Sequence, residues 1–202
     1  MSAVGPVERS RRLVLGISGS SAPQYGIALL RALGEAPGIE THLVLSPASH
    51  RTIELETDMK VVDVESMADV VHDPDDLAAS ISSGSFLTMG MVVAPCSMRT
   101  LASIAHGLED NLLTRAAGVT LKERRPLVLV TRETPLSLIH LRNMVAVTEA
   151  GATVLPPTPG FYHRPTSIED LIDQTTGKVL DQLAIEHHLF RRWTTPATED
   201  GP

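Results

Sequence analysis

Short apolar runs alternate with segments of helical periodicity along most of this chain, and this alternation limits the fold more than any other feature. The runs of strand length are Leu13–Ile17, Thr41–Leu45, Met91–Ala94, Pro126–Thr131 and Ala152–Leu155. Apolar residues recur at helical spacing between Ile27 and Leu33, and in segments 98–106, 111–121, 137–149 and 167–187. Strands that alternate with helices pair in parallel through right-handed crossovers. The pattern therefore predicts an α/β three-layer sandwich with a mostly parallel sheet.

One domain is expected between residues 11 and 193, with flexible tails at 1–10 and 194–202. The length of 202 residues is enough for one full core and short for two. Pro23 is expected in the first turn of the first helix, and Gly34 at its end. The stretch 58–85 is acidic and ends rich in serine, so a loop-rich excursion is expected there.

Composition argues against several classes of partner. The formal net charge of −7 argues against general affinity for nucleic acid or an anionic membrane, so a bound anion needs a local cluster of basic groups. No apolar run is long enough to span a bilayer, so no membrane span is predicted. The single cysteine, Cys96, favours a reducing compartment, with the cytoplasm as the default. The eight histidines show no metal-ligand spacing, and no metal is predicted.

Small and hydroxyl-bearing residues follow two of the expected strands. Ligands of open α/β sheets sit beyond the carboxyl ends of the strands, where the loops converge. The segment Gly19–Ser21 would let backbone amides approach an anion at a helix start, although a plain turn capped by Ser21 explains it equally well. The segment Ser97–Thr100 offers hydroxyls and free N–H groups at another helix start. There the alternative is that Ser97 is only an N-cap.

Charged and aromatic residues follow the last two strands. Arg132 and Glu133 stand side by side at the end of a buried run, where both charges need partners. Arg132 could clamp a phosphate through two hydrogen bonds, and Glu133 could move a proton. An ion pair between neighbouring elements is the alternative. Tyr162 could donate a hydrogen bond to an anionic leaving group, and an ordinary surface loop is an equally good interpretation.

Four more positions carry side chains that could take part in chemistry. Arg115 and Lys122 are seven residues apart in one helical segment and project from nearly the same face. They could serve a ligand or belong to a solvated charged surface. Glu56 is expected in a loop, exposed to solvent. Cys96 is expected to be a small buried residue and not a nucleophile, because no basic residue adjoins it.

Six motifs, taken together, resemble the UbiX-type flavin prenyltransferases, a family formerly described as phenylacrylic or hydroxybenzoate decarboxylase subunits. They occur in the family's order, and the likeness covers about residues 11–193. The motifs are Ser83-Gly84-Ser85, Pro95-Cys96-Ser97-Met98-Arg99-Thr100, Asn111-Leu112-Leu113-Thr114-Arg115-Ala116-Ala117, Leu121-Lys122-Glu123-Arg124-Arg125-Pro126-Leu127, Arg132-Glu133-Thr134-Pro135 and Pro159-Gly160-Phe161-Tyr162-His163. The run from Leu121 to Leu127, followed by Arg132–Pro135, is the most specific part.

The resemblance implies a Rossmann-like or flavodoxin-like flavoprotein that assembles as a homododecamer with its sites at subunit junctions. It implies metal-independent transfer of a dimethylallyl group from dimethylallyl monophosphate to N5 of reduced FMN, followed by a second bond at C6. The product, prenylated FMN, would pass to a UbiD-type decarboxylase.

The resemblance also implies roles for individual residues by position. Residues that match flavin contacts are Gly19, Ser20, Ser21, Ser46, Ser97, Met98, Arg99, Thr100 and Arg132. Residues that match the dimethylallyl-phosphate pocket are Arg115, Lys122, Glu133, Tyr162 and Lys178, where the family often has Arg at the last position. Residues that match catalytic groups are Ser21, Glu56, Lys122 and Glu133, with Ser21 and Glu56 implicated in proton handling. Trp193 matches a tryptophan that can cover the site.

Two segments depart from the family pattern. The usual first loop, Gly-Ala-Ser-Gly-Ala, here reads Gly19-Ser20-Ser21-Ala22-Pro23, so this chain lacks the second glycine of the flavin loop. The usual helix sequence Ala-Ala-Asp reads Ala116-Ala117-Gly118, which bears on an interface or on the helix itself.

Three other functions compete with prenyl transfer. A carrier that only hands on FMN would need the flavin loops but not Lys122, Glu133, Tyr162 and Lys178. A flavin-dependent decarboxylase of cysteinyl substrates carries a Pro-x-Met-Asn-x-x-Met-Trp signature where this chain has Arg132–Leu136. Direct decarboxylation of a phenolic acid would need a group that holds a carbanion, and the sequence offers none beyond the flavin.

Overall fold

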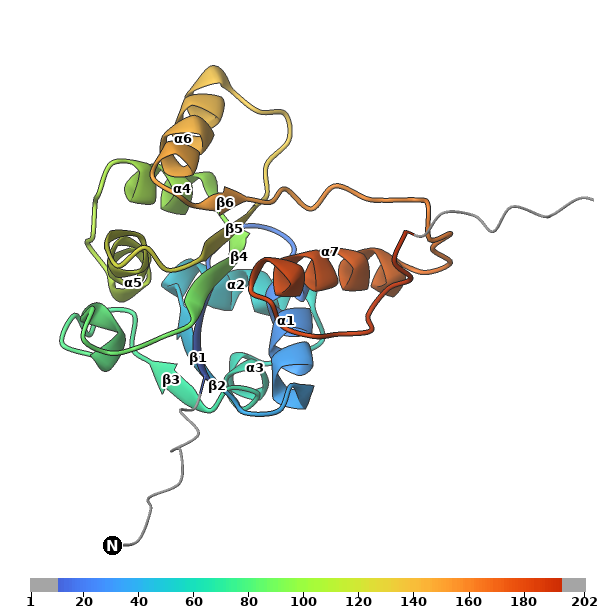
Figure 1. Cartoon of the computed structure of the whole chain (residues 1–202), viewed down its shortest axis with the longest axis horizontal. Helices are drawn as coiled ribbons and strands as arrows, with labels where there is room; N and C mark the ends of the chain where they lie inside the picture. The colour runs from blue at the N-terminus through green and yellow to red at the C-terminus, as the bar shows by residue number, and fades with distance from the viewer. Residues whose placement is uncertain (1–10, 194–202) are drawn as a thin grey trace, which may run out of the picture.

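A parallel sheet of six strands forms the centre of residues 11–193, the part of the chain that the computed structural model describes (Figure 1). The strands are β1 (Arg11–Ile17), β2 (Ile39–Leu45), β3 (Val70–His72), β4 (Gly90–Cys96), β5 (Leu127–Thr131) and β6 (Thr153–Val154). They stand in the order β3-β2-β1-β4-β5-β6, and every pair is parallel. The predicted α/β class is confirmed. The expected tails, 1–10 and 194–202, lie outside the described residues.

Helices cover both faces of the sheet and complete the three layers (Figure 1). On one face the core takes side chains from α1 (Gln24–Glu35), α2 (Pro47–Glu56), α3 (Val61–Glu65) and α7 (Ile168–Gln182). On the other it takes them from α4 (Met98–Ala105), α5 (Leu112–Lys122), α6 (Leu138–Glu149) and the short 3-10 helix η1 (Ser80–Ser82). None of the helices within 11–193 is long and apolar enough to cross a membrane.

Alternation along the central strands explains why the sheet has two cores. Leu13, Leu15 and Ile17 of β1 point to the α1 and α7 side, whereas Val14 points to the α4 and α5 side. Successive side chains of a strand face opposite ways, and a parallel sheet covered by helices is apolar on both faces. The runs read from the sequence are therefore continuous rather than alternating with polar residues.

The strand order places a topological switch point between β1 and β4. The chain leaves β1 towards β2 on one side and reaches β4 on the other, so the loops after β1 and β4 part in opposite directions. Sheets of this kind bind ligands in the crevice at that point, outside the carboxyl ends of the strands. The two loops are also tied together, because Ser18 Oγ donates to Pro95 O at 2.8 Å and accepts from Ser97 N at 2.7 Å.

Several predicted boundaries need correction. The segment 58–85 was expected to be rich in loops, but it contains α3, β3 and η1. The sequence did not predict them, because elements of three to five residues are too short to show a period. Helix α2 was not expected, and Glu56 is its last residue rather than part of a loop. Gly34 lies inside α1, which ends at Glu35. Helix α7 ends at Gln182, short of the expected 187, and Ala184 shortly after it takes a left-handed φ of 52°.

Candidate active site

The loop after β1 lies close against the start of α2. A Cβ at Gly19 would lie 2.3 Å from Ala48 Cβ and 2.9 Å from the Ala48 carbonyl carbon, so this approach requires glycine. Ser20 Oγ donates to Arg132 O at 3.1 Å, which joins the loop to the end of β5. Ser46 caps α2 by accepting from Ser49 N at 3.2 Å. The loops after β1, β2 and β5 thus meet at the carboxyl edge of the sheet.

Glu56 reaches back from the end of α2 to the same loop. Its Oε2 accepts from Ser21 Oγ at 3.0 Å and from the Ala22 N–H at 2.8 Å. Ala22 adopts a φ of 71°, a left-handed conformation that favours glycine, at the position where the resemblance expects glycine. The Glu56 carboxylate therefore both stabilises the turn at Ala22 and orients the Ser21 hydroxyl.

The loop after β4 begins α4 with a capped turn. Ser97 Oγ accepts from Thr100 N at 3.2 Å and lies 3.0 Å from Thr100 Oγ1. Ser97 is therefore an N-cap, which was the alternative interpretation of this residue. The backbone N–H groups of Met98 and Arg99 lie in the first turn of α4, where no carbonyl of the helix accepts from them. The cap leaves these donors open for an anion.

Arg132 and Glu133 are both exposed just beyond β5. Within residues 11–193 neither side chain forms a salt bridge, and Glu133 only accepts from the neighbouring Thr134 N at 3.0 Å. The alternative interpretation, an ion pair between elements, does not occur in the described part of the chain. Burial raises the pKa of Tyr25, against the lowering effects of a hydrogen bond with Thr175 and the charge of Arg132. Tyr25 therefore lies near Arg132, although the sequence analysis did not identify it as a site residue.

The donor set at this edge suits a flavin mononucleotide. Helices α1, α2 and α4 all begin here, and a helix N-terminus favours a phosphate through free N–H groups and its dipole. Hydroxyls of Ser46, Ser97 and Thr100 add neutral hydrogen-bond partners, and Arg132 adds a cation. Thr131 Oγ1, at the end of β5, is buried and has no hydrogen-bond partner in 11–193. The residues present therefore fit a ligand with one phosphate and a polar ring.

A second cluster lies around the C-terminal half of α7. Lys178 Nζ lies 3.6 Å from Asp181, and Arg192 donates to Asp181 at 2.8 Å. The hydrogen bond from Arg192 is the main cause that lowers the pKa of Asp181. Tyr162 and Trp193 pack edge to face with ring centroids 5.8 Å apart. Asp181 and Arg192 were missed in the sequence, because their link depends on the chain doubling back after α7.

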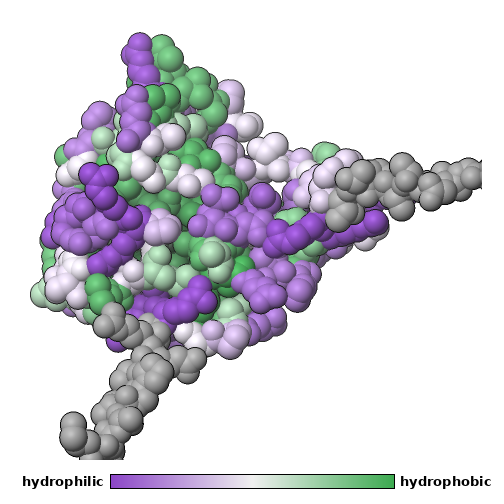
Figure 2. Space-filling view, in the orientation of Figure 1, coloured by the Kyte–Doolittle hydropathy of each residue, from purple (hydrophilic) through white to green (hydrophobic). Residues whose placement is uncertain are grey.

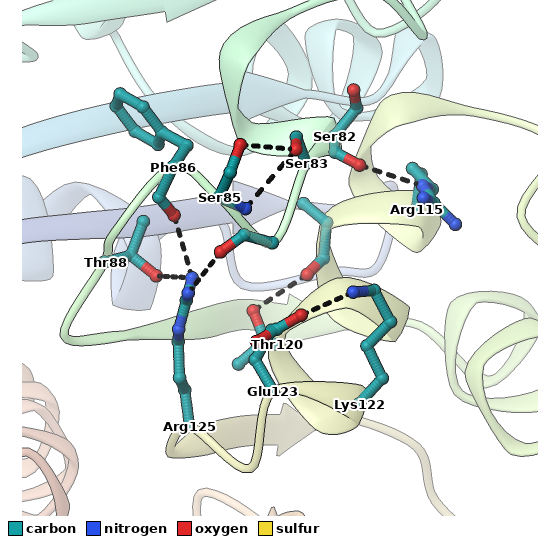
Figure 3. Close-up of polar contacts among 12 residues, drawn as sticks. Ser82, Ser83, Ser85, Phe86, Thr88, Arg115, Thr120, Lys122, Glu123 and Arg125 are labelled. Carbon is teal, nitrogen blue, oxygen red and sulfur yellow. Dashed lines mark hydrogen bonds and ion pairs between the residues drawn. The ribbon is translucent and has the colours of Figure 1, made fainter.

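Arg115 and Lys122 form a third cluster on α5 with the loop 82–88 (Figure 3). Arg115 Nε donates to Ser82 O at 3.1 Å. Lys122 forms an ion pair with Glu123, and the hydrogen bond from Lys122 lowers the pKa of Glu123. Arg125 donates to the backbone oxygens of residues 84 and 86 at 2.6 and 2.9 Å. A Cβ at Gly84 would lie 2.1 Å from Glu123 Oε1 and 2.8 Å from Lys122 Nζ, so glycine lets the loop pass close to this ion pair.

The structure does not bring Lys122 and Glu133 together within one chain. Lys122 ends α5 just before β5 starts, and Glu133 follows the end of β5. A strand of five residues is about 16 Å long at 3.3 Å per residue. Lys122 therefore lies towards the amino edge of the sheet, and Glu133 lies at the carboxyl edge with Ser21 and Arg132.

Cys96 is buried, and burial raises its pKa to about 12. The expectation of a small buried residue is confirmed. No group of three or more His, Cys, Asp or Glu side chains in residues 11–193 is arranged to hold a metal ion.

Comparison with known proteins decides the family. The sequence matches the flavoprotein family over residues 2–192. It is 57% identical over 185 residues to flavin prenyltransferase UbiX of Escherichia coli K12, with 91% of this chain and 98% of that protein covered. The chain belongs to the UbiX family of flavin prenyltransferases. The family and the enzyme class expected from the motifs are confirmed.

Two solved structures of this family share the fold closely. The crystal structure of AnUbiX in complex with FMN and dimethylallyl pyrophosphate has a TM-score of 0.90 and 52% identity, with 92% of this chain and 98% of that chain covered. A dodecameric FMN-dependent UbiX-like decarboxylase from Escherichia coli O157:H7 has a TM-score of 0.89 and 51% identity, with 91% and 99% covered. The family's predicted Rossmann-like or flavodoxin-like architecture is confirmed.

Proposed function

We propose that this flavin prenyltransferase moves a dimethylallyl group from its monophosphate to N5 and then C6 of reduced FMN. The observation that carries the proposal is the exposed pair Arg132 and Glu133, free of salt bridges in 11–193, at the edge where Ser21 and Glu56 are already joined. Arg132 is thus available to the flavin and Glu133 to the donor phosphate, beside a carboxylate that is positioned for proton transfer. The prenylated FMN would serve a UbiD-type decarboxylase.

The carboxyl-edge loops would hold the flavin. The first turn of α4 and the Ser46, Ser97 and Thr100 hydroxyls would bind its polar groups, and Arg132 would contact it from β5. When bound, reduced FMN supplies an electron-rich N5 nucleophile, so the chain needs no nucleophile of its own. This agrees with Cys96, the lone cysteine, which is buried with a raised pKa.

Two copies of the chain would build the phosphate pocket. Arg115 and Lys122 would supply positive charge from α5 of one copy, while Glu133, Tyr162 and Lys178 would come from another. This division follows from the length of β5, which separates Lys122 from Glu133 in one chain. The basic groups would stabilise the leaving phosphate more strongly in a pocket closed to water than in solvent.

Ser21 and Glu56 would handle the proton that leaves C6 during ring closure. Glu56 Oε2 already accepts from the Ser21 hydroxyl at 3.0 Å. A proton taken up by Ser21 could therefore pass to the carboxylate along an existing hydrogen bond, or the departed phosphate could accept it. Glu133 would share a proton with the donor phosphate.

Helix α6 supports a homo-oligomer. It buries only Asn143 and Val147 against the rest of the chain. Its exposed side chains include Leu138, Ile139 and Val145, each more than half accessible. Apolar surface of this kind gathers over α6 at the top of the space-filling view (Figure 2). Large exposed apolar patches mark interaction sites, and a second copy would cover this one. A relative of 51% identity is dodecameric, and we extend that assembly to this chain.

Anaerobic incubation of the protein with reduced FMN and dimethylallyl phosphate tests the proposal. Mass spectrometry of the released flavin should show a gain of one C5 unit. Unmodified FMN that stays bound would contradict prenyl transfer from this donor. The carrier alternative predicts that same unmodified flavin, and it leaves Lys122, Glu133, Tyr162 and Lys178 without a use. The family membership disfavours both the carrier and the decarboxylase.

Complementation tests the two-copy pocket. Lys122→Ala and Glu133→Ala would each abolish most turnover alone. Co-assembly of the two variants in one oligomer should restore part of it, because some junctions then combine an intact Lys122 with an intact Glu133. A mixed oligomer as inactive as either parent would mean that both residues act from the same chain.

A cytoplasmic location is proposed with this reaction, on the basis of the single reduced cysteine.

A further inference from the structure

Two of the three guanidinium nitrogens of Arg115 are held by the chain itself. Nε donates to the Ser82 carbonyl at 3.1 Å, and Nη1 donates to Glu109 in a short ion pair. Nη2 donates to no acceptor among residues 11–193. A guanidinium is planar, so fixing two nitrogens also fixes the direction of the third. The open Nη2 edge is thus oriented before any ligand arrives.

The Glu109 carboxylate occupies the space beside Gly118 that a side chain at residue 118 would enter. Glu109 lies in the connection between α4 and α5, and its carboxylate lies over Gly118. A Cβ at that position would be 2.0 Å from Glu109 Oε1 and 3.0 Å from its Cδ. Gly118 follows Arg115 by three residues on α5, so the two share a helix face.

Glycine inside a helix is otherwise unfavourable. It costs more backbone entropy than alanine, and residue 118 shows no left-handed φ that would call for it. The space taken by the Glu109 carboxylate gives a physical reason for this residue. The family pattern has an aspartate here, which would set a carboxylate on the same face of α5. In this chain Glu109 brings the carboxylate from a neighbouring loop.

We propose that Glu109 is a positioning residue for prenyl transfer. Its carboxylate, placed over Gly118, holds the guanidinium of Arg115 so that the open Nη2 edge meets the donor phosphate. The inference rests on the proposed function, in which Arg115 binds that phosphate. The proposal goes beyond that function in assigning Glu109 and Gly118 a joint role.

Relocating the carboxylate tests the proposal. Glu109→Ala should raise the KM for dimethylallyl phosphate about tenfold, the effect of losing one charge-assisted hydrogen bond, with FMN affinity unchanged. Glu109→Ala combined with Gly118→Asp should restore most of the affinity, because the aspartate fills the vacated space three residues after Arg115. Glu186→Ala is the matched control: it removes an equal charge from an exposed side chain with no ion pair in 11–193, and it should leave KM unchanged.

Three results would overturn the proposal: a KM in Glu109→Ala no higher than in Glu186→Ala, a rise that Gly118→Asp fails to reverse, or a fall in kcat and FMN affinity along with the rise. Glu109→Gln preserves the side-chain shape if the alanine variant folds poorly, and it should raise KM in the same direction.

A double-mutant cycle separates this proposal from the proposed function. Thermal unfolding of Glu109→Ala, Arg115→Ala and the double variant measures the coupling between the two side chains without reference to catalysis. Non-additive losses support the contact even if the wild-type chain transfers no prenyl group, in which case only the function fails. Additive losses would overturn the role of Glu109. If Arg115→Ala leaves KM unchanged, the assignment of Arg115 to the phosphate has failed.

Discussion

Ser21 and Glu56 are joined by a hydrogen bond of 3.0 Å from the serine hydroxyl to Oε2 of the carboxylate. The same oxygen accepts from the Ala22 N–H at 2.8 Å, where the backbone takes a φ of 71°. One carboxylate therefore shapes the loop after β1 and orients a hydroxyl at the carboxyl edge of the sheet. Its structural and chemical roles can be separated by substitution.

Glu56→Gln should slow turnover far more than it weakens flavin binding. The amide oxygen can still accept from Ser21 and Ala22, so the loop keeps its shape, but the side chain no longer takes up a proton. We expect turnover to fall about 10²- to 10⁴-fold, the usual contribution of a general base. Anaerobic turnover and an FMN titration measure the two effects. Wild-type turnover in this variant would exclude Glu56 as the base.

Gly19→Ala should destabilise the protein by about 1–3 kcal/mol, because the new methyl group would overlap Ala48, including its backbone. Gly34→Ala is the matched control. No atom lies within 4 Å of a Cβ at Gly34, inside α1, so alanine there should stabilise by about 0.5–1 kcal/mol. Denaturant unfolding at equal protein concentration compares them. Equal effects of the two substitutions would contradict the close approach of the loop to α2.

Ala22→Gly should raise the melting temperature slightly. A left-handed conformation costs a non-glycine residue about 1–2 kcal/mol, and glycine returns about 0.5–1 kcal/mol of this as backbone entropy. The expected net gain is between zero and about 1.5 kcal/mol, and thermal unfolding measures it. A lower melting temperature would mean that the Ala22 methyl group makes contacts that outweigh the strain.

The His72 imidazole should make the protein less stable below neutral pH. Burial, and then the charge of His42, lower the pKa of His72 below 6.5, against an opposing effect of Asp76. His42 Nδ1 lies 2.9 Å from His72 Nε2, and Glu40 contacts the other nitrogen of His42.

The direction follows from proton uptake. Below pH 6.5 the unfolded chain binds a proton at this position before the folded chain does, so stability falls as pH drops from 6.5 to the folded pKa. His72→Gln should remove that part of the decline. Melting temperatures measured between about pH 7.5 and pH 5.5 compare the two proteins. Parallel curves would contradict the prediction.

Cys96 should resist alkylation in the folded protein. Its thiol is buried and its pKa is raised to about 12, so almost no thiolate forms at pH 8. Iodoacetamide should label the chain only after denaturation, as mass spectrometry would record. Rapid labelling of the native protein would mean that the β4 end opens readily.

The local motifs carried most of the functional prediction. The apolar runs gave five of the six strands to within two residues, because a strand covered on both faces must be continuously apolar. The loops after β1, β4 and β5 were correctly expected at one edge, since the carboxyl ends of parallel strands converge. Strand β3 was missed because three residues show no period.

Pairs of residues far apart in the chain were not readable in advance. Ser21 and Glu56 were each assigned by resemblance, but their contact depends on the end of α2 lying beside the loop after β1. Glu109 belongs to no recognised motif, and its carboxylate comes to lie beside Gly118 and Arg115 only in the folded chain. Asp181 and Arg192 meet because the chain reverses after α7.

Residue order alone was enough to establish the layered architecture, the family and the identity of the candidate groups, since periodicity and motifs are local properties of the chain. The tertiary structure decided which of those groups meet. Lys122 and Glu133 are eleven positions apart in the sequence, yet β5 lies between them and directs them to opposite edges of the sheet. Proximity in space depends on strand direction and crossovers, and short-range patterns do not encode that.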